Sequence, residues 1–433
     1  MKNKLLSNIS LNFLIKAITY LFSFIELTYV TRILQPETFG KISFVSSFTG
    51  YFIMFANLGM PTYAMRSCAK VRDNKEELHK TFNELWSLCV ILSAISFGVF
   101  FLSVLLVRNF QKDVILLAIF GISILLQSVN CEWLYKGLEK FLFLAVVTFI
   151  CKVISLIGII LFVKSSQDVV IYAVLSVLIA HGSNILFFLL RKKYIDSKIT
   201  FTVNFAHLKP LLVFFMMSFA VSVYNNMDLT MLGFIKTEHD VGIYSIASKG
   251  KGVLSMTGGL VWSAILPYAT ALWKENAKEN FKKLATRSLL FVSGIQAAVS
   301  VVCIIFAPMI IRLIGGVSYS GAVPSFRILL FSLLPIGMSN ILGGQVLIPA
   351  GMEKKLLIAE IWGAAFNFCA NLFVIPRYSI EGAALTTVIS EIIVWLLCVY
   401  FCKRELGMDF GIGLLKKIVK KMINMLFSFF SRP

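Results

Sequence analysis

Charged residues are scarce in this sequence. Only 15% of its 433 residues are Asp, Glu, Lys or Arg, whereas 58% are hydrophobic, and the mean hydropathy is +0.84. A soluble domain carries about 25% charged residues. The composition therefore excludes a soluble globular protein and indicates an integral membrane protein.

The sequence motifs of common enzymes are also absent. No G-x-x-x-x-G-K-[ST] sequence occurs, and the Gly-rich run Lys249–Gly252 has neither the spacing nor the hydroxyl of a phosphate-binding loop. No H-E-x-x-H or G-x-S-x-G motif is present. The eight cysteines are scattered through apolar segments without a C-x-x-C pair. We therefore expect no catalytic residues, no bound metal and no cofactor.

Twelve apolar stretches are long enough to cross a hydrocarbon layer of about 30 Å. They lie near residues 8–31, 42–64, 82–107, 114–135, 141–163, 168–190, 208–234, 241–271, 285–310, 323–349, 356–376 and 380–402. The connections between them are too short to hold a separate catalytic domain. We expect an all-α integral membrane protein with twelve transmembrane helices.

The formal net charge of +19 follows the predicted topology. Of the 41 Lys and Arg residues, 28 fall in the termini and in alternate connections, on one predicted side of the membrane, and only 8 fall on the other side. Cytoplasmic connections of membrane proteins are enriched in Lys and Arg. We therefore expect both termini in the cytoplasm and no nucleic-acid partner.

A repeat about two hundred residues apart divides the predicted spans. Alignment of Gly40 with Gly242 places Glu26 on Asp228, which gives each half an acid in its first span. Each half then holds six spans, so both halves have the same orientation and are related by a pseudo-two-fold axis along the membrane normal. The expected lobes are residues 1–200 and residues 201–404.

Residues 405–433 differ from the spans. Their apolar residues cover one half of a helical wheel, and Lys416, Lys417, Lys420 and Lys421 lie on the other half. A helix of this kind lies in the membrane interface with its lysines on anionic headgroups. We expect an amphipathic cytoplasmic tail; a partner-binding helix is the alternative.

Ionisable residues inside the spans are the candidate functional groups, because each costs about 2.5–3.5 kcal/mol at a lipid-facing position. We expect them to line a polar cavity between the lobes or to have a partner. The candidates for substrate binding are Lys16, Lys152, Lys249, Lys251, Arg327 and Asn225. The candidates for ion coupling are Glu26, Asp228, Glu360 and Glu391.

Structural roles are alternatives for several of these residues. Glu26 could pair with Arg32 near the outer rim, and Asp228 could form an ion pair with Lys249. Arg327 lies close enough to the end of a span to face either the cavity or the interface. The spacing alone does not choose between these roles.

Three stretches carry a resemblance to a known family: the hairpin Thr31–Ser43, the run Asn57–Pro61 and the segment Glu132–Glu139. They resemble the bacterial polysaccharide repeat-unit flippases (Wzx-type) of the multidrug/oligosaccharidyl-lipid/polysaccharide exporter superfamily. The resemblance implies a MATE-like fold of two six-helix lobes. It also implies a substrate, an oligosaccharide on undecaprenyl diphosphate, which alternating access moves to the outer leaflet of the bacterial inner membrane for O-antigen or capsule synthesis.

The family further implies that basic cavity residues meet the anionic diphosphate, and that membrane lipids and the polymerase and chain-length proteins of the same pathway are partners. The main alternative is a cation-coupled small-molecule exporter of the same superfamily. Five bases against four acids within the spans favour an anionic substrate. A repeat-unit polymerase or ligase would need a large outer loop, which the sequence lacks.

Overall fold

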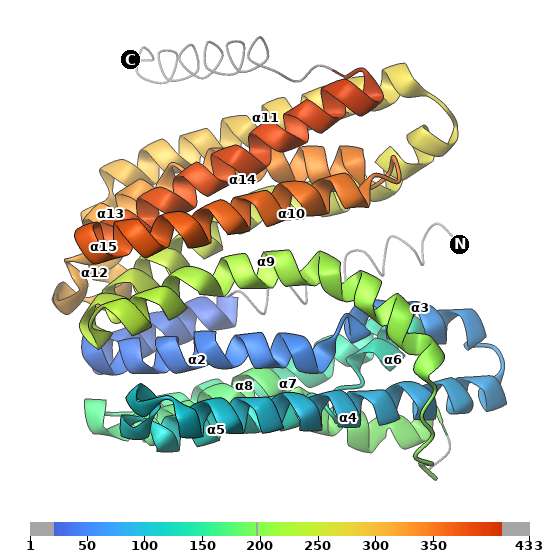
Figure 1. The fold of residues 1–433 in the computed structure, drawn as a ribbon, viewed down its shortest axis with the longest axis horizontal. Helices are drawn as coiled ribbons and strands as arrows, with labels where there is room; N and C mark the ends of the chain where they lie inside the picture. The colour runs from blue at the N-terminus through green and yellow to red at the C-terminus, as the bar shows by residue number, and fades with distance from the viewer. Residues whose placement is uncertain (1–20, 196–197, 409–433) are drawn as a thin grey trace. The chain divides into compact units, whose positions relative to one another are not determined.

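A computed structural model of the chain describes residues 21–195 and 198–408 (Figure 1). Every regular element within these ranges is helical, and they contain no strand. Seven of the described helical stretches are long and apolar enough to cross a membrane. The chain is a multi-pass membrane protein, as its composition predicts. The number of twelve spans stays a prediction from the sequence.

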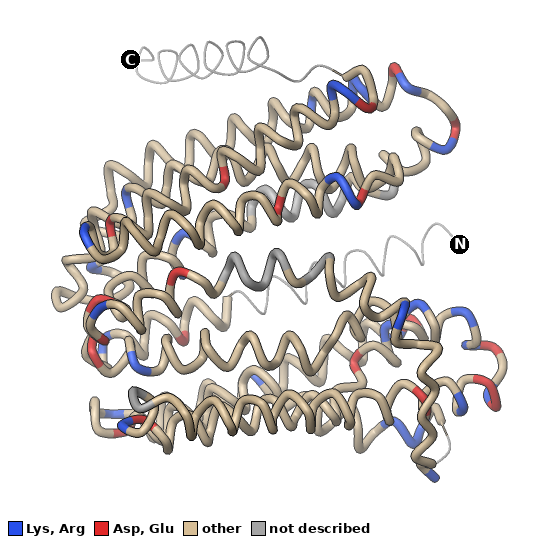
Figure 2. Tube along the Cα trace, in the orientation of Figure 1, with Lys and Arg blue, Asp and Glu red and all other residues tan. Residues whose placement is uncertain are grey.

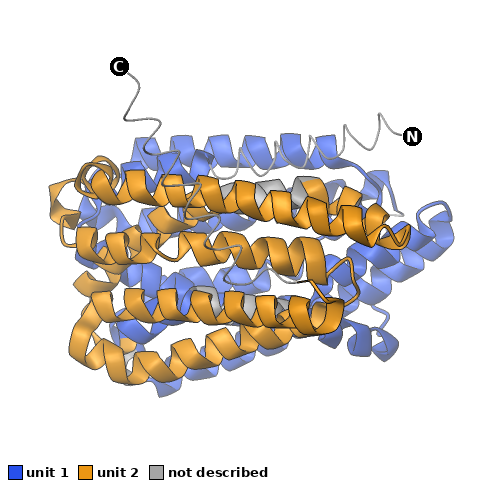
Figure 3. Ribbon diagram, turned by 90° about the horizontal axis from the view of Figure 1, so that it is seen from above, with its two compact units in different colours: residues 1–233 blue, residues 234–433 orange. Residues whose placement is uncertain are grey.

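Two compact units make up the chain, residues 1–233 and 234–433 (Figure 3). The boundary between them falls near the end of α9 (Leu208–Ile235). Most of α9 therefore belongs to the same unit as the helices that precede it. The lobe boundary predicted at residue 200 assigns this helix to the second half of the repeat, and it stays a prediction.

Unit 1 opens with a helical segment at residues 21–33. Its further helices are α2 (Pro36–Asn57), α3 (Met60–Val71), α4 (Lys75–Leu106), α5 (Val114–Leu125), α6 (Glu132–Gly137), α7 (Phe141–Phe162) and α8 (Val169–Leu190). α2 packs against α4 and α5, α3 packs against α6, and α7 packs against α8. The bounds of α7, α8 and α9 agree closely with three predicted spans.

Two predicted spans of unit 1 are interrupted. The φ angles of Leu58 and Gly59 are 37° and 76°, so the span predicted at 42–64 is divided between α2 and α3. Glycine adopts this left-handed conformation readily, and Pro61 stands in the first turn of α3, where its missing N–H is not needed. The span predicted at 114–135 is likewise divided between α5 and α6.

The described residues of unit 2 form six α-helices and a π-helical segment. They are α10 (Glu238–Lys274), α11 (Lys278–Ile305), α12 (Ala307–Gly315), α13 (Ala322–Leu330), α14 (Leu333–Asn340), the π-helix Ile341–Leu347 and α15 (Glu353–Leu406). α15 reverses at Ser379, where φ is 47°. It therefore contains both spans predicted at 356–376 and 380–402, as two arms that lie side by side (Figure 1).

Short 3-10 turns join several of these helices. They are Arg108–Lys112, Ser166–Asp168, Arg191–Lys193, Phe205–His207 and Val317–Tyr319. Charged residues gather near the helix ends of each unit, whereas the middles of the helices are mostly uncharged (Figure 2). Many Leu, Ile, Val and Phe side chains along these middles are exposed, which is typical of helix faces that contact lipid.

The repeat in the sequence is also a repeat of local structure. The alignment of Gly40 with Gly242 places Pro36, the first residue of α2, on Glu238, the first residue of α10. The two starts are stabilised differently. Proline itself opens α2, whereas Thr237 caps α10 by accepting a hydrogen bond from the Asp240 N–H at 3.2 Å.

Candidate functional site

Lys152 and Glu26, predicted for two different roles, interact inside unit 1. Lys152 extends from α7 and is only 8% exposed, and the carboxylate of Glu26 exerts an electrostatic attraction on its ammonium group. The Tyr172 hydroxyl of α8 donates a hydrogen bond to Glu26 Oε1 at 3.1 Å. A buried charge is tolerated when it is paired and hydrogen-bonded. The negative charge of Glu26 therefore offsets part of the cost of burying Lys152.

Packing holds the helix of Glu26 against α7. The Tyr29 hydroxyl lies 3.1 Å from the carbonyl oxygens of both Ile160 and Val163, which share its single proton as acceptors. Phe22 meets Phe149 edge to face, with ring centroids 5.7 Å apart. These contacts fix the register of residues 21–33 on α7, so the position of Glu26 relative to Lys152 follows from helix packing.

Asp228 lies in α9 on the side that packs against α2. It is 8% exposed, and its charge acts on the Tyr51 hydroxyl of α2. Nearby, the Ser47 hydroxyl is 2.7 Å from Thr230 Oγ1 and donates to the Asn226 carbonyl oxygen at 2.8 Å. Hydroxyls and the carboxylate of Asp228 thus form a polar seam between two apolar helices.

Glu360 and Glu391 stand on the two arms of α15. Glu391 is 9% exposed, and the two carboxylates interact electrostatically. Like charges that repel each other in an apolar surrounding favour a state in which one of them binds a proton or a cation. No group of three His, Cys, Asp or Glu side chains suited to a metal ion occurs among the described residues.

Amide side chains also lie between the two arms of α15. Asn371 Nδ2 donates to Asn367 Oδ1 at 3.1 Å, and the Thr386 hydroxyl of the second arm donates to Asn371 Oδ1. Asn367 Nδ2 is buried without a hydrogen-bond partner among the described residues. The arms approach closely beside it, because a Cβ at Gly363 would lie 2.4 Å from Val394 Cγ2.

The basic candidates of unit 2 lie apart from one another. Gly250 faces α13, where a Cβ would lie 3.2 Å from the Phe326 ring. Lys249 and Lys251 flank it at about 100° on either side, so they project from different faces of α10. Arg327 is exposed, and its Nε donates to the Ile304 carbonyl oxygen at 3.2 Å. The prediction for Lys16 lies outside the described residues, as does the side chain of Asn225.

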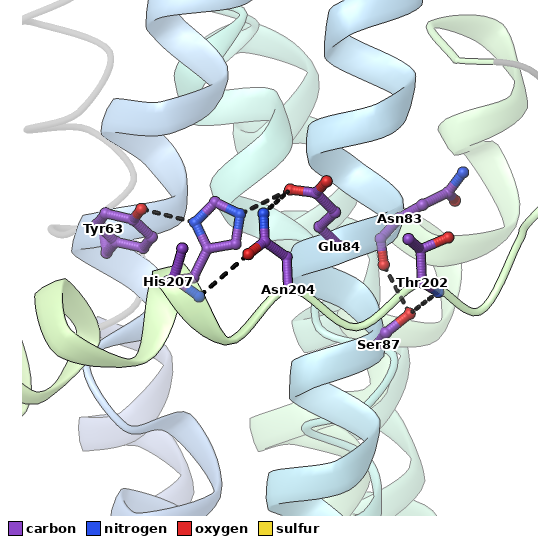
Figure 4. A network of polar contacts seen from close by, with 8 residues as sticks. Tyr63, Asn83, Glu84, Ser87, Thr202, Asn204 and His207 are labelled. Atoms are coloured by element: carbon purple, nitrogen blue, oxygen red, sulfur yellow. Dashed lines mark hydrogen bonds and ion pairs between the residues drawn. The ribbon is translucent and has the colours of Figure 1, made fainter.

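A network that the sequence did not predict joins α3, α4 and the 3-10 turn Phe205–His207 that precedes α9 (Figure 4). His207 Nε2 lies 2.8 Å from Glu84 Oε2, and His207 Nδ1 lies 2.7 Å from the Tyr63 hydroxyl. Asn204 Nδ2 donates to the same Glu84 oxygen at 3.1 Å. With its proton on Nε2, His207 donates to the carboxylate and accepts from Tyr63, which satisfies both ring nitrogens.

The connection before α9 is held along α4 by the same helix face. The Thr202 N–H donates to Ser87 Oγ at 2.9 Å, and Asn83 Nδ2 donates to Thr200 Oγ1 at 2.9 Å. These bonds join residues more than one hundred positions apart, and no local sequence pattern signals them. The described part of the connection at 191–207 is therefore attached to unit 1.

Outside the spans, Arg72 at the end of α3 meets Glu139 in the turn before α7. Arg72 Nη1 and Glu139 Oε1 are 2.6 Å apart. The hydrogen bond that Arg72 donates to Glu139 and the negative charge of Glu139 raise the pKa of the Arg72 guanidinium. Both groups are well exposed to solvent, so the pair fixes the turn more than it stabilises the fold.

Several proteins resemble this chain over its length. An O-antigen transporter by name, from Shigella dysenteriae, is 26% identical, with 90% of this chain and 98% of that protein covered. A protein of the same name from Escherichia coli (strain K12) is 25% identical, with 89% and 94% covered. The capsular polysaccharide biosynthesis protein CapF of Staphylococcus aureus is 23% identical, with 92% and 100% covered.

Solved structures share the fold. An inward-facing multidrug resistance MATE family transporter of the MOP superfamily superposes with a TM-score of 0.70 at 16% identity, covering 92% of this chain and 96% of that one. The lipid II flippase MurJ in an inward closed conformation gives a TM-score of 0.69 at 18% identity, covering 94% and 92%. The MATE-like, all-helical fold expected from the sequence is confirmed.

A protein-family model covers more than half of the chain. The model, described as polysaccharide biosynthesis protein, matches residues 5–273. This range holds all three stretches that carry the resemblance in the sequence. The chain belongs to the polysaccharide biosynthesis protein family.

Proposed function

We propose that this protein is a flippase that moves a polyprenyl-diphosphate-linked oligosaccharide from the cytoplasmic to the outer leaflet of the bacterial inner membrane. The observation that carries the proposal is the similarity of about nine-tenths of the chain to two proteins named as O-antigen transporters. The capsular polysaccharide relative extends the similarity to a second class of surface polysaccharide. The common step is transfer of a lipid-linked repeat unit, and no bond is made or broken.

Electrostatics favours this direction of movement. With the cytoplasm negative, each elementary charge gains about 2.3 kcal/mol per 100 mV when an anion moves outward. A diphosphate headgroup is therefore driven out of the cell once a path is open. Coupling to an ion gradient would add to this force. In unit 2, the carboxylates of Glu360 and Glu391 are the candidates to bind the coupling ion.

The basic candidates differ in their readiness to bind an anion. Lys152 is buried in unit 1 and attracted electrostatically by Glu26, so a diphosphate would compete with an existing attraction. Lys249 is exposed and Lys251 is half-buried, on different faces of α10. We assign the first anion contact to Lys249 or Lys251, with Lys16, Asn225 and Arg327 as further candidates.

A gene deletion tests the proposal. Cells without the gene should lose surface polysaccharide and accumulate the undecaprenyl-linked oligosaccharide in the inner leaflet, and the intact gene should restore both. Normal surface polysaccharide with altered tolerance to cationic drugs would instead support the small-molecule exporter. Reporter fusions after residues 70 and 275 should give cytoplasmic signals, and a fusion after residue 110 an external one. Crosslinking in the same cells would test contact with the polymerase and chain-length proteins.

A further inference from the structure

An open groove of about 580 Å³ lies in unit 2 where α11 begins and α15 ends. Its volume falls within the range of about 300–1,000 Å³ that small-ligand sites occupy. Four basic side chains, Lys278, Lys282, Lys283 and Arg287, line it together with one acid, Glu279. Figure 2 shows basic and acidic residues together at this end of the unit, but most of the charged residues that line the groove are basic. The groove is therefore positively charged.

The basic side chains share one side of α11 because the opposite side is buried. Phe281 and Ala285 are each 1% exposed in the core of unit 2. Lys278 and Lys282 are one helical turn apart, as are Lys283 and Arg287, and Glu279 and Thr286 lie between these two rows. All six of these residues line the groove, outside the face that Phe281 and Ala285 bury in the core.

The other wall of the groove is held by the turn that ends α15. Gly407 has a φ of 63°, a conformation that glycine adopts without strain. The Gly407 N–H donates to the Lys403 carbonyl oxygen and the Met408 N–H to that of Cys402, at 3.1 Å each. Met408 is 4% exposed and packs in the same core as Phe281. Leu406 and Met408 give the groove an apolar wall opposite its charges.

Most of the positive charge in the groove is not compensated. Lys283 pairs with Glu279 at 3.4 Å, but both side chains are largely exposed, so the pair is weak. Lys278, Lys282 and Arg287 have no acidic side chain within 4.0 Å among the described residues. The guanidinium fork of Arg287 matches the geometry of a phosphate. The lysines at positions 416–421 of the tail carry the same sign as the groove, so charge complementarity favours an anionic occupant over the tail.

We propose that this groove binds the headgroup phosphate of an anionic phospholipid in the cytoplasmic leaflet. The basic side chains hold the phosphate, and Leu406 and Met408 contact the glycerol and the start of the acyl chains. The placement in this leaflet rests on the topology of the proposed function, in which basic connections are cytoplasmic. Lipid binding itself does not require transport.

Native mass spectrometry of the full-length protein tests this site. The purified protein is titrated with phosphatidylglycerol or, as the neutral control, with phosphatidylcholine of the same acyl chains. K282Q/R287Q should bind phosphatidylglycerol about 25-fold more weakly, because each basic residue at an anionic surface contributes a factor of about five. The matched variant K70Q/K75Q removes two exposed lysines from a basic connection of unit 1 and should bind as the wild type does.

Four outcomes would overturn the proposal. They are equal affinity of K282Q/R287Q and wild type, equal affinity for the two lipids, displacement of the lipid by millimolar inorganic phosphate, and displacement by an equimolar polyprenyl diphosphate. The third would assign the groove to a free anion, and the fourth would assign it to the flippase substrate. The two proposals can fail separately. If deletion of the gene leaves surface polysaccharide normal but the wild-type protein still binds phosphatidylglycerol, the lipid-binding site stands and only the flippase function is rejected.

Discussion

The imidazole of His207 and the carboxylate of Glu84 lie 2.8 Å apart, although 123 positions separate them in the chain. Glu84 is 7% exposed, so its oxygens depend on these partners. His207→Ala should therefore lower the free energy of unfolding by about 1–3 kcal/mol, the cost of an unsatisfied buried acceptor. Thermal unfolding in detergent measures this change. His239→Ala, at an exposed histidine in α10, is the control and should have no effect; equal stability of both variants would contradict the role of the network.

Gly59 should not tolerate a side chain. A Cβ there would lie 2.6 Å from the Phe215 backbone nitrogen and 2.7 Å from the Leu211 carbonyl oxygen, and the φ of 76° adds strain. Gly59→Ala should destabilise the protein by about 2–4 kcal/mol. Gly98→Ala is the matched control, because no atom lies within 4 Å of its Cβ and alanine favours a helix interior by up to about 1 kcal/mol. Unfolding curves that rank the two variants in the opposite order would reject the close approach of α9.

Lys152 and Glu26 should behave as a pair. Lys152→Met removes the positive charge that attracts the half-buried Glu26 and should destabilise unit 1 by about 1–3 kcal/mol, whereas the double variant K152M/E26Q should recover most of this loss. Lys192→Met, at an exposed lysine, should be neutral. Additive effects of K152M and E26Q would show that the two residues are independent.

The same double variant separates structure from substrate binding. If Lys152 serves only to pair with Glu26, a stable K152M/E26Q protein should restore surface polysaccharide in a deletion strain. If the diphosphate contacts Lys152, the stable double variant should be inactive. Polysaccharide yield is measured at matched protein levels.

Glu360 and Glu391 should couple transport to an ion. Glu360→Gln removes one of two interacting carboxylates, so the protein should be at least as stable as wild type, and transport in vesicles should lose its dependence on an imposed proton or sodium gradient. Glu381→Gln, on the same helix, should keep this dependence. A gradient dependence unchanged in E360Q would exclude Glu360 as a coupling residue.

The spans were predictable where an apolar run ends abruptly in polar residues. This is so for α7, α8 and α9, and for the two arms of α15, which Pro376 and Arg377 separate. Helix breaks inside apolar runs were missed, as at Leu58, because hydropathy reports burial in lipid and not backbone conformation. Gly59 and Pro61 were the available local signal.

The candidate residues were predictable as a class, but their partners were not. An ionisable residue in an apolar run indicates that its charge must face a polar cavity or a partner side chain. Its partner depends on which helices pack together, as for Tyr172 and Glu26, which are 146 positions apart. His207 and Glu84 lie outside the apolar middles of the helices, where polar residues are common, so the sequence gives no signal that they interact.

The reversal at Ser379 bears on how the chain enters the bilayer during synthesis. The first arm of α15 carries Asn367 and Asn371, and the hydroxyl that Asn371 needs comes from Thr386 of the second arm. An arm inserted alone would expose these amides to lipid at a cost that pairing removes. Residues 353–406 should therefore leave the translocon together as one helical hairpin, after the ribosome has completed both arms.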